Sequence, residues 1–214
     1  MDNKLPITKI YLSDNSWLVI QPNFWNISPD EFNYLWELSQ DLDDVYIKMF
    51  GKLVKVPRKT TLFSNHPEVS YKFSGTIVKS LPITPDSIIG KILQYFNDNI
   101  SNIEPSISIN LDKKGQYFNG VFGNWYKDGK EYINQHSDDE KDLNSNMGIW
   151  SISFGGVRKF VLTDKKTGKK VKEIDLEDGM LLGMCGDFQK EFKHGIPKQK
   201  IAKPRINLTI RAFN

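Results

Sequence analysis

The sequence predicts a mainly β fold with flanking helices (α+β), in which a double-stranded β-helix, or jelly roll, forms the core. Two observations favour this class. Two helix starts are clear in the first hundred residues, whereas the C-terminal half consists of short β-rich runs separated by turn residues. Many short strands at this spacing are typical of an antiparallel sandwich or jelly roll. The two helices are then expected to cover one outer face of it.

Both helices are predicted from their N-terminal caps. Residues 28–31 (SPDE) form a capping box with proline at the first helical position. Apolar residues at helical spacing continue this pattern to about Leu42. Residues 84–87 (TPDS) precede a second apolar stripe, which ends near Phe96.

Between the two helices, residues 44–56 predict a β-hairpin with Phe50 and Gly51 at its tip. An exposed aromatic side chain at a hairpin tip is unusual in a soluble protein. The residues alone leave open whether the Phe50 ring stands exposed or folds back into the core.

Six β-rich runs follow the second helix and extend to the end of the chain. Turn residues, such as those at 127–129 (KDG) and 167–168 (TG), separate these runs. We expect strands within residues 119–126, 148–156, 158–164, 169–176, 179–186 and 205–213.

The composition is that of one globular domain. The chain has 214 residues, of which 39% are hydrophobic and 26% are charged. No apolar run approaches the roughly 18 residues that span a bilayer, and the N-terminus has no signal-peptide core. The single cysteine, Cys185, lies in an apolar run, where an inert buried thiol is expected. We therefore expect a soluble intracellular protein without membrane contact.

The charge pattern points weakly to polyanionic partners. The net charge is +3, and positive residues gather at 52–59, 164–170 and 197–205. Each cluster taken alone is typical of a solvated loop, whereas three clusters on one face would form a phosphate-binding surface. The sequence leaves both interpretations open.

The last predicted strand carries polar side chains at alternate positions. Because strand side chains alternate between faces, Ile206, Leu208 and Ile210 share one face. The other face is either simply solvated or a cradle for a small dicarboxylate, since arginine binds carboxylates well. The residues on this second face are Arg205, Asn207, Thr209 and Arg211.

A possible metal site begins with His136 and Asp138, which stand two apart on an extended segment and can bind one ion together. An acidic surface loop is the alternative. Of the two other histidines, His66 lies before a proline in a predicted surface loop, whereas His194 lies just before the arginine-bearing strand. Two histidines and one carboxylate form the facial triad of non-haem Fe(II) oxygenases. A dicarboxylate cradle beside such a triad fits 2-oxoglutarate, with O₂ as the second co-substrate.

Several segments together resemble the AlkB family of nucleic-acid dealkylases, over roughly residues 45–213. They are residues 124–129 (NWYKDG), 136–140 (HSDDE), 151–155 (SISFG), 194–197 (HGIP) and 205–211 (RINLTIR). The resemblance is closest to a family member that acts on duplex DNA. It implies a jelly-roll fold, Fe(II) and 2-oxoglutarate, with His136, Asp138 and His194 as iron ligands. It also implies that the co-substrate is held by Asn124, Tyr126, Arg205, Asn207, Thr209 and Arg211.

The resemblance extends to a substrate-binding surface. It implies that Phe50 wedges into the base stack, that Phe73 stacks on a flipped base opposite His136, and that Asp139 and Glu140 face the base edge. Residues 53–55 and Met49 depart from the family pattern, which affects the duplex preference more than the chemistry. The implied substrate-binding residues are Phe50, Gly51, Lys52, Arg58, Tyr71, Phe73, Ser74, Asp139, Glu140, Lys198 and Lys200.

The implied activity is oxidative demethylation of 1-methyladenine or 3-methylcytosine in DNA, which is direct reversal of alkylation damage. Duplex DNA is the favoured substrate, and single strands or RNA are alternatives. The rival functions are oxidation of a protein side chain and non-catalytic nucleic-acid binding. We expect one monomeric dioxygenase domain over residues 1–214, nuclear if the source is eukaryotic. Residues 1–100 would supply helical support and a nucleotide-recognition lid, and residues 101–214 the catalytic core.

Overall fold

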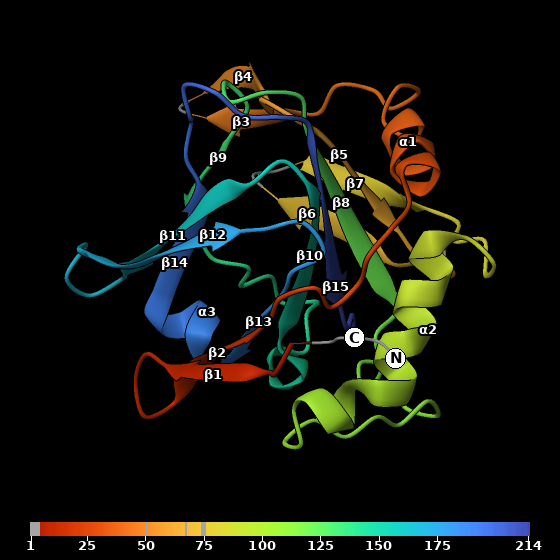
Figure 1. The fold of residues 1–214 in the computed structure, drawn as a ribbon, viewed down its shortest axis with the longest axis vertical. Coiled ribbons are helices and arrows are strands. Elements are labelled where there is room, and N and C mark those ends of the chain that lie inside the picture. Colours follow the sequence, from red (N-terminus) through yellow and green to blue (C-terminus); the bar gives the residue numbers. More distant parts are fainter. Residues whose placement is uncertain (1–4, 50, 67, 74–75) are drawn as a thin grey trace.

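The computed structural model describes residues 5–49, 51–66, 68–73 and 76–214. Within these ranges a large sheet and a small sheet lie face to face, and helices pack on the outside of the large one (Figure 1). The large sheet contains, in spatial order, β1 (Thr8–Tyr11), β2 (Ser16–Gln21), β13 (Leu181–Gly186), β10 (Ile149–Gly155), β15 (Arg205–Arg211), β8 (Gly120–Tyr126), β5 (Lys59–Phe63), β7 (Thr76–Leu81) and β6 (Ser70–Phe73). The small sheet contains β12 (Lys170–Leu176), β11 (Arg158–Asp164), β14 (Phe192–Ile196) and β9 (Ile133–His136).

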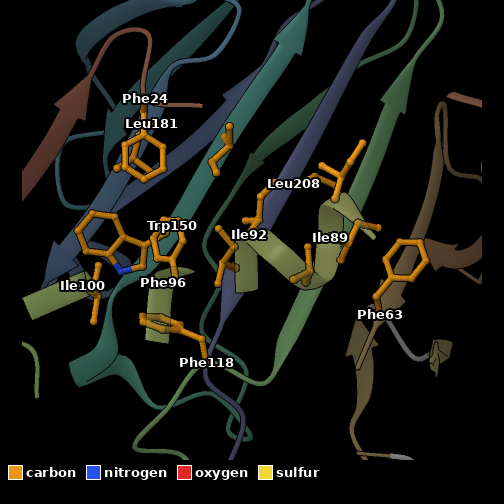
Figure 2. Close-up of a cluster of buried hydrophobic side chains, with 14 of the residues drawn as sticks. Phe24, Phe63, Ile89, Ile92, Phe96, Ile100, Phe118, Trp150, Leu181 and Leu208 are labelled. Atoms are coloured by element: carbon orange, nitrogen blue, oxygen red, sulfur yellow. The ribbon is translucent and has the colours of Figure 1, made fainter. Parts of the chain in front are cut away.

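The two predicted helices cover the outer face of the large sheet. Helix α1 spans Pro29–Glu37 and begins with the predicted capping box, in which Ser28 accepts a hydrogen bond from the Glu31 backbone. Helix α2 spans Ile88–Ile103, with Ser87 as its N-cap. Figure 2 shows Ile92 and Phe96 of α2 packed in a buried cluster with Trp150 and Leu208 of the sheet. Burial of so much apolar surface stabilises this side of the fold.

The inner face of the large sheet packs against the small sheet. Its buried cluster includes Tyr126 of β8, Phe160 of β11 and Met184 of β13. Because the large sheet is covered on both faces, its central strands are buried almost throughout. Strand β15 therefore divides its side chains as predicted. Its three aliphatic residues are fully buried toward the helices, and its polar residues lie on the side of the small sheet.

The predicted hairpin is present as β3 (Tyr46–Met49) and β4 (Lys52–Lys55), which lie at the top of the molecule in Figure 1. Phe50 lies outside the described residues. Gly51 has a φ of +77°, a conformation that glycine adopts readily. The base of the hairpin is held by Asp44, which pairs with Lys55 and with Lys59.

Two features differ from the sequence prediction. Helix α1 ends at Glu37 rather than near Leu42, because the hydroxyl of Ser39 donates to the carbonyl of Trp36 and the chain turns there. Strands β1, β2, β5, β6 and β7 were not predicted, and they join the same sheet as strands that follow residue 100. The division of the domain at residue 100 stays a prediction about function.

Helix α3 (Phe188–Glu191) and a 3₁₀ turn (Ser145–Met147) complete the described elements. None of the helices in the described ranges has the length and apolarity to cross a membrane.

Candidate metal and co-substrate site

Sheet pairing brings the predicted metal ligands together. His136 at the end of β9 is the register partner of His194 on β14, and the ring centroids are 4.3 Å apart. Asp138 follows two residues after His136 and is almost fully buried. One ligand atom from each of these three residues lies within 4.8 Å of the other two. The geometry is therefore that of a three-residue metal site.

The charges around Asp138 keep its carboxylate ionised. Burial alone raises the pKa of this carboxyl group, but the positive charge of Arg211 and the hydrogen bond from His136 outweigh burial and hold the pKa below its usual range. The Arg211 guanidinium lies 3.1 Å from Asp138 Oδ2. The two histidines approach the same carboxylate at 3.4 Å and 3.7 Å. A charged carboxylate is the form that binds a metal ion.

Both imidazole rings turn a nitrogen atom toward the carboxylate of Asp138. His136 Nδ1 lies 2.9 Å from the carbonyl oxygen of Asn134. Because a carbonyl only accepts hydrogen bonds, Nδ1 carries a proton, and Nε2 is the ring nitrogen that faces Asp138. Burial, followed by the nearby His136, lowers the pKa of His194 to about 3, so that this ring is neutral near pH 7.

Arg205, at the other end of β15, is a fully buried cation. Its Nη2 donates to Ser153 Oγ at 2.9 Å, and its guanidinium lies 5.2 Å from the centre of the Tyr126 ring. Within the described residues, its Nε and Nη1 atoms have no hydrogen-bond partner. Burial lowers the pKa of Arg205 to about 10, which still leaves it charged at pH 7. A buried guanidinium with two such donors fits an anionic ligand.

Two amides face the space between the ends of β15. Asn207 donates to Ser151 Oγ and to the carbonyl of Ile152. Asn124, its register partner on β8, accepts at Oδ1 from Arg58 Nε at 2.6 Å and from the hydroxyl of Thr60 at 3.2 Å. Because the oxygen of Asn124 is occupied, its amide nitrogen is the group left to donate to a ligand.

The metal cluster, Asn124 and Asn207 line one cavity of about 520 Å³, which extends to the β3–β4 hairpin. Such a volume suits a small-molecule site. Arg205 does not itself line this cavity, but it contacts the ring of Tyr126, which does. The predicted residues that line this cavity are Arg58, Asn124, Tyr126, His136, Asp138, Asp139, Glu140, His194, Asn207, Thr209 and Arg211.

The family model of the 2OG-Fe(II) oxygenase superfamily matches residues 50–211, which is most of the chain. The chain belongs to this superfamily. The match includes all three residues of the metal cluster and the whole of β15. The predicted resemblance to the AlkB family is confirmed by the relatives that the chain matches.

Human DNA oxidative demethylase ALKBH2 is 33% identical over 173 residues, which cover 77% of this chain and 60% of that protein. Mouse alpha-ketoglutarate-dependent dioxygenase alkB homolog 3 is 38% identical over 103 residues, which cover 44% of this chain and 36% of that protein. The chain thus spans about 60% of the length of the first of these relatives. The solved structure of OsALKBH1 has a TM-score of 0.60 at 16% identity, over 97% of this chain and 100% of that one. This likeness confirms the predicted jelly-roll fold.

The residues of the metal cluster and of β15 fit the groups that give the superfamily its name. Two imidazoles and one ionised carboxylate are the donor set of a non-haem Fe(II) site. The open donors of Arg205 fit one carboxylate of a dicarboxylate such as 2-oxoglutarate. The family match and the cluster His136–Asp138–His194 together support Fe(II) and 2-oxoglutarate as the cofactor and co-substrate.

The predicted substrate residues are placed unevenly. Asp139 and Glu140 line the cavity, and Asp139 pairs with Lys165 at 3.5 Å. Lys198 lies over the ring of Tyr132, which also lines the cavity, and Lys52 and Lys200 are exposed. Phe50 and Ser74 lie outside the described residues. The side chains of Tyr71 and Phe73 are likewise not described.

Sequence reasoning missed several residues that support the candidate site. Ser151 and Ser153 of β10 hold Asn207 and Arg205. The signal was two serines at alternate positions of an otherwise apolar run. Gln189 of α3 accepts a hydrogen bond from the backbone of Asp138 at 2.9 Å. No local pattern indicates this contact, because Gln189 and Asp138 are 51 residues apart. His66 contacts Tyr117 rather than the metal cluster, in keeping with its predicted surface-loop position.

Proposed function

We propose that this protein is an Fe(II)- and 2-oxoglutarate-dependent dioxygenase that removes N-methyl groups from bases in DNA, with duplex DNA as the favoured substrate. The observation that carries this proposal is the cluster of His136, Asp138 and His194 at the wall of a cavity that also holds the arginine-bearing strand. The likeness to a relative named DNA oxidative demethylase supports the choice of DNA.

When bound, iron and 2-oxoglutarate would allow O₂ to oxidise a base N-methyl group, and 2-oxoglutarate would be converted to succinate and CO₂. The hydroxymethyl product loses formaldehyde and leaves the unmodified base. In this proposal His136, Asp138 and His194 hold the metal, Arg205 and Arg211 each hold one carboxylate of 2-oxoglutarate, and Asn124, Tyr126, Asn207 and Thr209 orient it. The cavity holds these groups in a fixed arrangement beside the proposed substrate.

A flipped base is the proposed occupant of the cavity mouth. The reactive methyl group of 1-methyladenine lies on the Watson–Crick edge, so the base must leave the duplex before it can be oxidised. Asp139 and Glu140 line the cavity near the metal cluster, where negative charge favours a cationic methylated base. Lys55 and Arg58 line the same cavity, and Lys198 lies on its rim residue Tyr132. Such basic groups suit a phosphate backbone.

The first prediction tests the reaction itself. A duplex oligonucleotide with one 1-methyladenine, incubated with protein, Fe(II), 2-oxoglutarate and O₂, is expected to lose the mass of one CH₂ unit, with release of formaldehyde. Mass spectrometry of the oligonucleotide gives the readout, and omission of 2-oxoglutarate is the control. An unchanged mass, in protein shown to contain iron, refutes the demethylase.

The second prediction tests the duplex preference. Replacement of Phe50, at the predicted hairpin tip, by alanine is expected to slow demethylation of duplex DNA by at least about tenfold, because unstacking a base step costs a few kcal/mol, which the apolar wedge offsets. Turnover of the same lesion in a single strand is expected to be unchanged. Leu53→Ala, an exposed apolar side chain on β4, is the matched comparison. Equal loss on both substrates removes the wedge assignment.

A further inference from the structure

Arg158, the first residue of β11, is a buried charge that the proposed reaction does not use. Its side chain is fully buried, and in the ranges that the structure describes no carboxylate forms a salt bridge with it. Burial lowers the pKa of its guanidinium, which measures the cost of keeping a cation there. Hydrogen bonds from the guanidinium offset this cost, and their partners show what the side chain holds.

The guanidinium of Arg158 binds two loops at once. Nη2 donates to the backbone carbonyls of Glu131 and Pro197, both at 2.8 Å. Nη1 donates to the carbonyl of Asp128 at 3.2 Å, and Nε donates to the side-chain oxygen of Gln199 at 2.8 Å. The loop between β8 and β9 and the loop between β14 and β15 are therefore joined through one side chain.

The two loops also contact each other directly. The backbone N–H of Gln199 donates to the carbonyl of Gly129 at 2.8 Å. A Cβ atom on Gly129 would lie 2.0 Å from the Gln199 carbonyl oxygen, so glycine permits this approach. Beyond this point Lys198 Nζ lies 4.7 Å from the centre of the Tyr132 ring. Together the two loops present an aromatic ring and a cation at the cavity rim.

Arg158 also contacts Tyr126, a residue that lines the cavity and is predicted to bind 2-oxoglutarate. Its guanidinium lies 5.3 Å from the centre of the Tyr126 ring, and Arg205 lies 5.2 Å from the same ring. One buried side chain thus contacts a wall of the predicted 2-oxoglutarate pocket and the backbone of both rim loops. The position of the rim relative to the pocket is fixed by these contacts.

We propose that Arg158 is a positioning residue that holds the rim formed by residues 127–132 and 197–200, and that this rim binds the DNA strand carrying the damaged base. The proposal rests on the proposed function and adds a residue to its substrate side. A planar guanidinium can reach four acceptors on two loops in a fixed geometry, which the single ammonium of lysine cannot do. Charge alone is therefore insufficient at this position.

Arg158→Lys tests the proposal, with Lys159→Gln on the same strand as the control. The Lys159 side chain is partly exposed and pairs with Glu173 and Asp175, away from the rim. For R158K, the KM for the oligonucleotide and its Kd from fluorescence anisotropy are expected to rise roughly tenfold, because small misplacements of a binding surface are costly. The kcat and the KM for 2-oxoglutarate are expected to stay within about threefold, since the charge beside Tyr126 is kept.

Amide hydrogen exchange supplies a second readout. In R158K, exchange is expected to speed up in residues 127–132 and 197–200 and to stay unchanged elsewhere. An oligonucleotide Kd and exchange rates equal to those of the wild type overturn the proposal. If R158K lowers the melting temperature sharply, Gln199→Ala decides, because it removes one acceptor and leaves the buried charge in place. A raised oligonucleotide Kd in Q199A supports the role of Arg158 in holding the rim, and an unchanged Kd overturns it.

The same measurements separate this inference from the proposed function. If the wild-type protein binds the oligonucleotide but does not demethylate it, the proposed function is refuted. The Kd of R158K then still tests whether Arg158 holds the rim. Wild-type protein that binds no oligonucleotide overturns the inference as well.

Discussion

Replacement of Asp138 by asparagine is expected to abolish demethylation, with a loss of at least about 10³-fold in turnover, because a metal site contributes several kcal/mol to such chemistry. The substitution keeps the shape of the side chain and removes its charge. Asp138 is the one carboxylate of the cluster, and its oxygens lie 3.4 Å and 3.7 Å from the nitrogens of His136 and His194. A neutral amide oxygen is a much weaker ligand for Fe(II).

The measurement pairs turnover with the iron content of the purified protein. D138N is expected to lose iron at a chelator concentration that leaves the wild type loaded. Asp142→Asn, the same chemical change at an exposed position four residues later, is the control and is expected to retain both iron and turnover. If D138N retains more than about a tenth of the wild-type turnover, Asp138 is not the metal ligand assigned here, because loss of a metal ligand is expected to cost several kcal/mol.

Replacement of Arg205 by methionine is expected to have the second largest effect, on 2-oxoglutarate binding. Truncation of one partner in a buried charge pair typically costs about 2 kcal/mol or more, which is at least about 30-fold in affinity. Arg205 is fully buried, and two of its donor atoms have no partner among the described residues. We therefore expect the KM for 2-oxoglutarate to rise by this factor, while oligonucleotide binding is preserved.

The same variant has an unusual expected effect on stability. Burial lowers the pKa of Arg205 to about 10, below the ordinary value of 12.5, so the ionised guanidinium is less favourable in the folded chain than in the unfolded one. This cost is fully present below about pH 10 and disappears only as the pH rises through the folded and then the unfolded pKa. R205M removes the cost, and methionine fills much of the space. Without 2-oxoglutarate, the melting temperature is therefore expected to be unchanged or higher.

Differential scanning fluorimetry checks both expectations together. Saturating 2-oxoglutarate is expected to raise the melting temperature of the wild type and to leave that of R205M unchanged, since a ligand stabilises only the protein that binds it. Lys159→Met removes a positive charge from a partly exposed site and is expected to keep the full shift. A full shift in R205M places the co-substrate elsewhere.

Much of the fold followed from local signals in the sequence. The capping box at Ser28 gave the start of α1, since a cap is formed by residues adjacent in the chain. The six runs from residue 119 onward all became strands, with boundaries within two residues of those predicted. The short strands β9 and β14 were not predicted, although they carry the two histidines. They are held by pairing with each other and, for β14, with β11, rather than by their own propensity.

The sequence by itself determined the chemistry of the site: a His-x-Asp pair, one later histidine, and a strand with polar side chains at every second position. These are properties of spacing along the chain, because a strand fixes the direction of its own side chains. Only the tertiary structure decided which side chains meet across the fold. The register of β9 and β14 placed His136 opposite His194. The packing of β11 beneath two loops let the Arg158 side chain bind the backbone of both. Such contacts join residues tens of positions apart, and local periodicity carries no information about them.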